Sequence, residues 1–140
     1  MHANVILQRV SLAGVLIAAT LPSVVGAADA ELKHCLDAAD GGEQKRCTQE
    51  LFRKASDELT TAYAGALEKA AAADARNAAD GGSSSALAES QRVWEIYRDA
   101  ECKGVVGRGG GSGRMVWVFG CLAEKTRERI GELNVPFYQR

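Results

Sequence analysis

The stretch Glu50–Ala73, ELFRKASDELTTAYAGALEKAAAA, decides the fold. Its apolar residues recur at intervals of three and four, the period of an amphipathic helix: they are Phe52, Ala55, Leu59, Ala62, Tyr63, Ala66 and Ala70. The alternation typical of a strand is absent. The alanine-rich continuation to Ala79 also favours a helix, because alanine has the highest helix propensity. The segment therefore predicts a long helix with one buried face.

A turn with capping residues precedes this helix. In Asp40-Gly41-Gly42-Glu43, the glycines can end a short helix that carries Cys35. Asp40 can then accept hydrogen bonds from the free amides of the next helix, with Glu43 reaching back. We expect a short N-terminal helix followed by a tight turn.

Two further helices are predicted downstream, each after a glycine-rich break. Asp80–Ser85 interrupts the first helix and supplies candidate N-caps, and a second helix follows from about Ala86 to Cys102. We expect its buried stripe to be Leu87, Ser90, Val93 or Trp94, Tyr97 and the flank of Cys102. Its outward residues are expected to be Arg92, Glu95, Arg98 and Asp99.

The helical pattern stops at Gly104. The next residues, GVVGRGGGSG, predict an irregular loop as far as Gly113, because glycine loses the most backbone entropy on ordering. A last helix is expected from about Met115 to Leu133, ending at Asn134 and before Pro136. Its apolar side is Val118, Phe119, Leu122, Thr126, Ile130 and Leu133. Its charged sides are Glu124, Lys125, Arg127, Glu128 and Arg129.

Each long helix has an apolar stripe that it cannot bury alone, so the helices must pack together. The predicted fold class is all-α: a small disulfide-stapled bundle of three main helices plus a short N-terminal helix. We find no internal repeat and no boundary that would divide it.

The N-terminal residues have the pattern of a signal peptide. Arg9 is the only Lys or Arg before an uncharged run from Val10 to Val25, and Val25-Gly26-Ala27-Ala28 offers small residues for cleavage after Ala27 or Ala28. No cysteine follows where a lipid anchor would need it. We predict a signal peptide at residues 1–28 and a periplasmic or secreted domain at residues 29–140, without a membrane anchor.

Four cysteines lie in the predicted mature part, and an even number in an exported chain indicates disulfides. Three pairings are possible. We favour Cys35–Cys47 and Cys102–Cys121, which close the two shortest loops and flank glycines. In the chain-entropy model each bond contributes about 3 kcal/mol. A zinc site is the alternative, but zinc ligands usually include a close pair such as Cys-x-x-Cys.

The sequence does not predict an enzyme, a metal site or a cofactor site. His34 is the single histidine of the predicted mature part, and an exposed helix residue is the simpler interpretation than a catalytic base. Glu95, Asp99 and Glu101 resemble paired carboxylates, but arginines among them favour solvated ion pairs. The net charge of −1 gives no nucleic-acid footprint. The glycine loop lacks the Lys-Ser/Thr ending of a phosphate-binding loop.

Recognition by shape remains, and the glycine loop is its candidate site. A disulfide-anchored loop with little side-chain bulk can enter a cleft, and the anchor lowers the entropy cost of binding. The residues fit a plain flexible connector equally well. The candidate partner-binding residues are Arg108, Gly109, Gly110, Gly111, Ser112, Gly113 and Arg114.

The run Gln91–Cys102, QRVWEIYRDAEC, resembles the signature of the LprI-type lysozyme-inhibitor family. Other parts of the pattern follow in order: Cys35, Cys47, Asp57-Glu58-Leu59, Tyr63, the glycine stretch, Cys121, Thr126, Arg127 and Leu133. The signature residues that we regard as structural are Tyr63, Gln91, Trp94, Tyr97, Arg98 and Asp99. The resemblance implies an exported, disulfide-stapled helical domain. We expect Trp94 and Tyr97 to lie in its core.

The resemblance also implies inhibition of lysozyme or a related cell-wall hydrolase by a binding protein without a cofactor. Ser112, Arg108 or Arg114 would then meet the two carboxylates of the muramidase cleft. Two other functions fit the same residues: an immunity or chaperone-like protein for another effector, and a structural or stress-induced envelope protein.

Overall fold

The computed structural model describes residues 24–77, 82–109 and 111–135, which form helices and turns and no strand. The elements are α1 (Val24–Leu36), α2 (Gly41–Arg76), α3 (Ser83–Asp99), a π-helical segment η1 (Ala100–Val105), two 3₁₀ turns η2 (Val106–Arg108) and η3 (Gly111–Gly113), and α4 (Arg114–Leu133). The all-α prediction is confirmed, with three long helices and a shorter N-terminal one.

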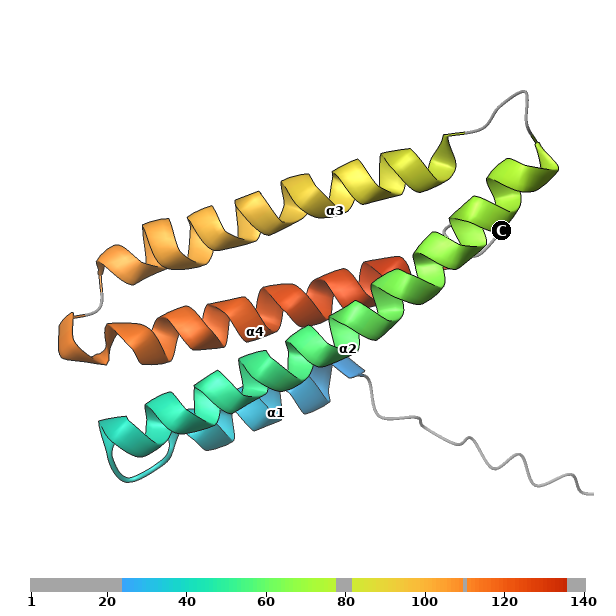
Figure 1. Ribbon diagram of the computed structural model, residues 1–140. Helices are drawn as coiled ribbons and strands as arrows, with labels where there is room; N and C mark the ends of the chain where they lie inside the picture. Colours follow the sequence, from blue (N-terminus) through green and yellow to red (C-terminus); the bar gives the residue numbers. More distant parts are fainter. Residues whose placement is uncertain (1–23, 78–81, 110, 136–140) are drawn as a thin grey trace, which may run out of the picture.

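Helix α2 is the longest element and contacts the other three α-helices (Figure 1). Helix α4 packs along α2, and α1 folds back against α2. Helix α3 lies beyond α4 in the view of Figure 1 and also contacts α2. The connection from α3 to α4 lies at the same end of the bundle as the turn from α1 to α2 (Figure 1). That end therefore brings together two turns that are distant in the sequence.

The apolar interior of the described residues includes two clusters. One contains Leu59, Ala66, Leu87 and Leu133, contributed by α2, α3 and α4. The other lies nearer the glycine-rich connection and has Cys102, Val118 and Leu122 at its centre, with Phe52, Met115 and Phe119 packed against them. Full burial of a leucine or valine side chain is worth about 1.5–3 kcal/mol, so both clusters contribute to holding α4 on α2.

The turn between α1 and α2 forms with Asp40 as its cap, but among the hydrogen bonds of the described residues none has the Glu43 side chain reaching back to the Asp40 amide. Asp40 Oδ1 accepts a hydrogen bond from the Glu43 amide at 2.8 Å, which is the predicted N-cap. The Gln44 side-chain amide donates to the carbonyls of Leu36 and Ala38, which lie at the unsatisfied end of α1. The Cys35–Cys47 disulfide, with Cα atoms 5.3 Å apart, then staples the two helices together.

Helix α3 is capped by a residue that precedes the predicted N-caps. The Asp74 carboxylate of α2 accepts hydrogen bonds from the amides of Gly82, Ser83 and Ser84 at 3.2, 2.9 and 2.9 Å. The Ser84 hydroxyl donates to the same carboxylate at 2.6 Å. The Ser84 hydroxyl and amide bind the charged form, so they hold the pKa of Asp74 well below its ordinary value. Asp80 lies outside the described residues.

The predicted buried face of α3 is partly wrong. Leu87 is buried as expected, but Val93 and Tyr97 are 50% and 52% exposed, and Ser90 is exposed as well. The residues that face the bundle are Leu87, Gln91, Trp94, Arg98 and Cys102. The prediction missed this face because Gln91 and Arg98 are polar, and a hydrophobic pattern assigns polar residues to the surface.

The helical path also continues past Gly104, contrary to the prediction. After Asp99 the chain winds through η1 and η2 as far as Arg108, and Gly111–Gly113 forms the further 3₁₀ turn η3. Gly107 is buried, and a Cβ there would lie 3.3 Å from the Val118 side chain and 3.5 Å from the Cys102 carbonyl. Glycine at this position lets the connection pass close against α4.

The predicted signal peptide lies mostly outside the described residues, which begin at Val24 within it. Over the described ranges, none of the helices has the length and hydropathy that crossing a membrane would require.

We predict that Asp74→Asn lowers the melting temperature at pH 7, because the neutral amide binds the α3 amides more weakly than the carboxylate does. The folded pKa of Asp74 is lowered, so its contribution is fully present above the unfolded value of about 3.9 and is lost as pH falls from there through the folded pKa. The difference between wild type and variant should therefore narrow below about pH 4.

Thermal unfolding followed by circular dichroism across pH 2–7 measures this difference. The control is Asp37→Asn, which removes an exposed ion pair with Lys33 and should change little. A difference between wild type and Asp74→Asn that stays constant over the whole range would contradict the assignment.

Candidate functional site

The glycine loop Arg108–Arg114 lies at one end of the bundle, between η2 and α4 (Figure 1). Arg108, Gly109, Gly111, Ser112 and Arg114 are exposed and Gly113 is half-buried, while Gly110 lies outside the described residues. Gly111 has a φ of +51°, a left-handed conformation that favours glycine. The described residues of the predicted partner-binding loop thus form one exposed surface feature.

Both sides of this loop are fixed to the bundle. The Cys102–Cys121 disulfide joins η1 to α4, with Cα atoms 5.5 Å apart, and Gly107 packs against Val118 just before the loop. None of the four cysteines is free, so the zinc alternative is excluded. The loop is therefore short, low in side-chain bulk and anchored at both ends.

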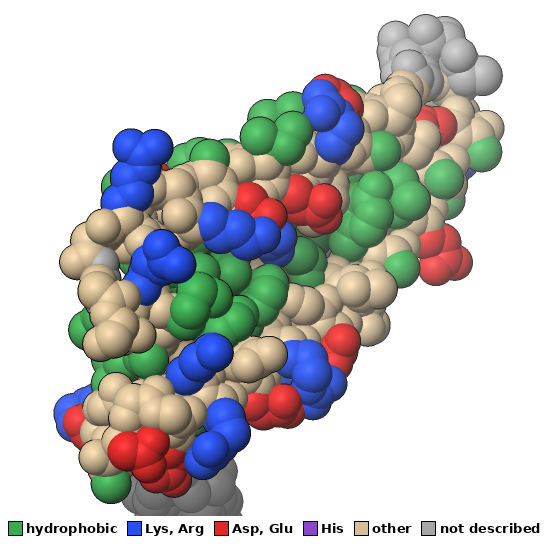
Figure 2. All heavy atoms as spheres, turned by 60° about the vertical axis from the view of Figure 1, so that its left-hand side comes forward, with side chains coloured by type: hydrophobic (Ala, Val, Ile, Leu, Met, Phe, Trp, Pro, Cys, Tyr) green, Lys and Arg blue, Asp and Glu red, His purple; other side chains and the backbone are tan. Residues whose placement is uncertain are grey.

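An apolar groove of about 480 Å³ opens beside the loop, and we call it the loop groove. Its apolar surface comes from Phe52 of α2 and from Met115, Val118, Phe119 and Leu122 of α4, and its charged edge from Lys103 and Arg114. Figure 2 turns this end of the molecule forward and shows hydrophobic side chains bordered by Lys and Arg. The groove was not predicted, because its residues come from four elements, α2, η1, η2 and α4, and no local pattern connects them.

A second depression of about 540 Å³ shares the side chains of Phe52 and Phe119 with the loop groove. We call it the α2 groove, since its other lining residues all belong to α2: Arg46, Gln49, Glu50, Arg53, Ser56 and Asp57. The two shared rings are stacked, with centroids 6.4 Å apart. The two depressions thus meet along one aromatic ridge.

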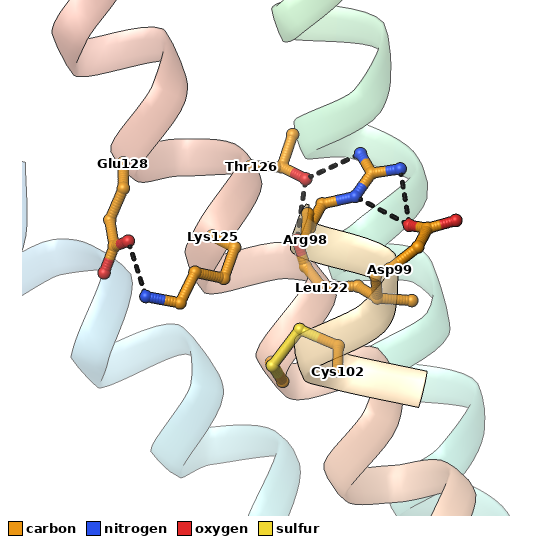
Figure 3. The surroundings of a disulfide bond; sticks show 8 residues. Arg98, Asp99, Cys102, Leu122, Lys125, Thr126 and Glu128 are labelled. Atoms are coloured by element: carbon orange, nitrogen blue, oxygen red, sulfur yellow. Dashed lines mark hydrogen bonds and ion pairs between the residues drawn. A yellow bond between two sulfur atoms is a disulfide. The ribbon is translucent and has the colours of Figure 1, made fainter. Parts of the chain in front are cut away.

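Behind these grooves, Arg98 joins the two apolar clusters. Its guanidinium lies 5.0 Å from the centroid of the Trp94 ring and 5.5 Å from that of Phe52. It donates to Asp99 Oδ1 at 2.9 and 3.0 Å and to Thr126 Oγ1 at 3.5 Å (Figure 3). The Arg98 side chain is only 13% exposed. The prediction that Arg98 points outward is therefore wrong.

Arg129 of α4 is a second poorly exposed arginine, and it joins α4 to α3. Its side chain is 5% exposed, and its Nε donates to Gln91 Oε1 at 3.1 Å. Further hydrogen bonds reach Ser90 and Glu132, and the guanidinium also faces the Trp94 ring at 5.9 Å. The prediction of an outward Arg129 is likewise wrong. The buried guanidinium is tolerated because each of its three nitrogens donates a hydrogen bond.

The signature residues thus form an internal scaffold between α2, α3 and α4. Gln91, Trp94 and Arg98 are internal, and Tyr63 packs against the first apolar cluster. Tyr97 is the exception and corrects our prediction, because it is half-exposed together with Val93 and Ile96 on the outer face of α3.

Of the three carboxylates singled out in the sequence, Asp99 pairs with Arg98 and Lys103. Glu95 instead accepts a hydrogen bond from the Gln91 side-chain amide, and none of the ion pairs among the described residues includes Glu95 or Glu101. Burial by itself would raise the pKa of Asp99, but hydrogen bonds from Lys103 and Arg98 outweigh it and hold the pKa below its ordinary value. Asp99 therefore stays ionised at neutral pH, where a general acid would need a raised pKa. Within the ranges described, no group of three His, Cys, Asp or Glu side chains is arranged to hold a metal ion.

Comparison with known proteins identifies the family. A family model described as "Lysozyme inhibitor LprI" matches residues 35–133, a range that includes both disulfides, the signature and the glycine loop. The chain belongs to the LprI lysozyme-inhibitor family. An uncharacterized protein of Rhizobium meliloti (strain 1021) is 36% identical over 106 residues, covering 71% of this chain and 76% of that protein. No solved structure matches.

For this LprI-family chain we predict that Arg98→Met destabilises the fold by about 1–3 kcal/mol. The substitution removes the cation that faces the two aromatic rings and the hydrogen bonds that it donates to Thr126 and Asp99. In a double-mutant cycle with Trp94→Leu, we expect a coupling energy of about 1 kcal/mol for the cation and ring.

Urea unfolding of the four proteins measures this coupling. Arg92→Met is the matched control, since Arg92 is on the same helix but is exposed and pairs with the exposed Glu89. It should change stability by less than about 0.5 kcal/mol. Additive effects of the Arg98 and Trp94 substitutions would rule out the interaction as a stabilising contact.

Proposed function

We propose that this chain is an exported binding protein that inhibits lysozyme or a related cell-wall hydrolase in the periplasm. The observation that carries the proposal is the LprI match, which spans residues 35–133 and so takes in nearly all of the predicted mature domain. The protein acts through its surface and has no catalytic role of its own in this proposal.

Two observations support export, and the proposed function requires it. The first residues have the charge and hydropathy pattern of a signal peptide, with cleavage proposed after Ala27 or Ala28. Both pairs of cysteines form disulfides, which persist in oxidising compartments. A lysozyme inhibitor must also meet its target outside the cytoplasm. A mass measurement on the exported product tests the proposed cleavage directly.

In the proposed mechanism the glycine loop enters the substrate cleft of the hydrolase. Its backbone has little side-chain bulk around Gly109–Gly113, so it can approach the cleft walls closely. The disulfide and the packing of Gly107 hold its ends, which limits the entropy lost on binding. Exposed Arg108, Ser112 and Arg114 present donors to the two carboxylates of the enzyme. Substrate is then excluded by volume.

The test is to titrate the exported, oxidised protein against c-type, g-type and i-type lysozymes, following both calorimetric binding and hydrolysis of cell walls. We expect saturable inhibition of at least one class, and loss of inhibition after reduction of the disulfides. If the folded, oxidised protein neither binds nor inhibits any of them, the proposed function is wrong.

We predict that Arg108→Glu weakens inhibition at least about tenfold, or about 1.4 kcal/mol, because it places a carboxylate against the carboxylates of the cleft. Lys69→Glu is the matched control: it makes the same charge change on the exposed surface of α2, about 25 Å along the helix from Phe52. Equal inhibition by both variants would exclude the loop as the contact, while leaving inhibition itself established.

A further inference from the structure

The loop groove and the α2 groove together combine an apolar surface with an excess of positive charge. Their shared ridge is formed by Phe52 and Phe119, both half-buried and stacked at 6.4 Å. Exposed Arg46 lines the α2 groove, and exposed Arg114 and Lys103 line the loop groove. A surface of this kind favours a ligand that is apolar at its centre and negative on its flanks.

Three arginines at or beside this surface lie outside the described ion pairs. In the part of the chain that the structure describes, none of the ion pairs includes Arg46, Arg108 or Arg114. The two acids of the α2 groove, Glu50 and Asp57, are both held by Arg53, at 2.5 and 2.8 Å. Among the described residues, Arg46 and Arg114 therefore lie outside the ion pairs, whereas Lys103 is paired with Asp99.

The floor of the grooves is supported from inside. Arg98 lies against the inner side of the ridge, 5.5 Å from the Phe52 centroid, and Leu122 beneath the groove is 1% exposed. Lys103 is oriented by its bond to Asp99 at 2.6 Å. This support fixes the apolar side chains in place before a ligand arrives, which lowers the cost of binding.

We propose that these two grooves bind a segment of a protein partner in which an aromatic or aliphatic side chain is flanked by carboxylates. The apolar side chain packs on the Phe52–Phe119 ridge, and the carboxylates pair with Arg114 on one side and Arg46 on the other. The inference deepens the proposed function, since the loop groove adjoins the glycine loop and would hold the rim of the same partner. It rests on groove chemistry that does not require the partner to be lysozyme.

The test uses the full exported chain, labelled with ¹⁵N, and three blocked five-residue peptides. The first is Glu-Leu-Asp-Phe-Glu, the second replaces its acids with lysine, and the third replaces its apolar residues with serine. We expect the first peptide to shift the amides of Lys103, Met115 and Phe119 saturably, and the other two to bind at least tenfold more weakly. Binding of the first should weaken as salt is raised.

Arg46→Glu should weaken binding of the first peptide at least fivefold, and Lys69→Glu should leave it unchanged. Arg46 is outside the glycine loop, so this variant separates the two proposals.

If lysozyme is inhibited but no peptide reaches the grooves, the groove proposal fails and the proposed function stands. If the peptide binds the grooves but no lysozyme is bound, the proposed function fails and the groove proposal stands. Groove shifts caused only by phosphatidylglycerol vesicles would also overturn the proposal, in favour of an anionic lipid surface.

Discussion

A single guanidinium connects the two halves of the interior. Arg98 lies between the rings of Trp94 and Phe52, which belong to different apolar clusters, and binds Thr126 of α4 and its own neighbour Asp99 (Figure 3). A poorly exposed cation is tolerated only when its hydrogen-bonding groups are satisfied and its charge is compensated. Here two rings, a hydroxyl and a carboxylate do this together, so α2, α3 and α4 must meet in one arrangement.

This arrangement determines where the surface features lie. Because Arg98 fixes the last turn of α3, the π-helical segment that follows places Cys102 against Cys121, and Gly107 can then pack on Val118. Lys103 is brought to the loop groove in the same way, through its bond to Asp99. The signature residues thus act on the exposed end indirectly, by setting the position of the chain that leaves α3.

The helices, the disulfide pairing and the first cap were predictable, because each depends on a local pattern: the helical period around Leu59, the two short loops, and Asp40 before Gly41. The buried face of α3 was not. Gln91 and Arg98 have polar side chains that can lie inside the bundle because they form hydrogen bonds with Arg129 and Thr126 of α4. These partners are distant in the sequence, so no local pattern predicts the contacts. The grooves were missed for the same reason, since Phe52 and Phe119 become neighbours only through tertiary packing.

The net charge of −1 conceals a local asymmetry, because it averages over faces that a partner would meet separately. At the loop end, Arg46, Arg108 and Arg114 are exposed, and the nearby acids Asp57 and Asp99 are already bound to arginine or lysine. The exposed Asp57–Arg53 pair contributes little to stability. The exposed arginines beside the grooves would then attract an acidic segment at short range, even though the whole chain is weakly acidic.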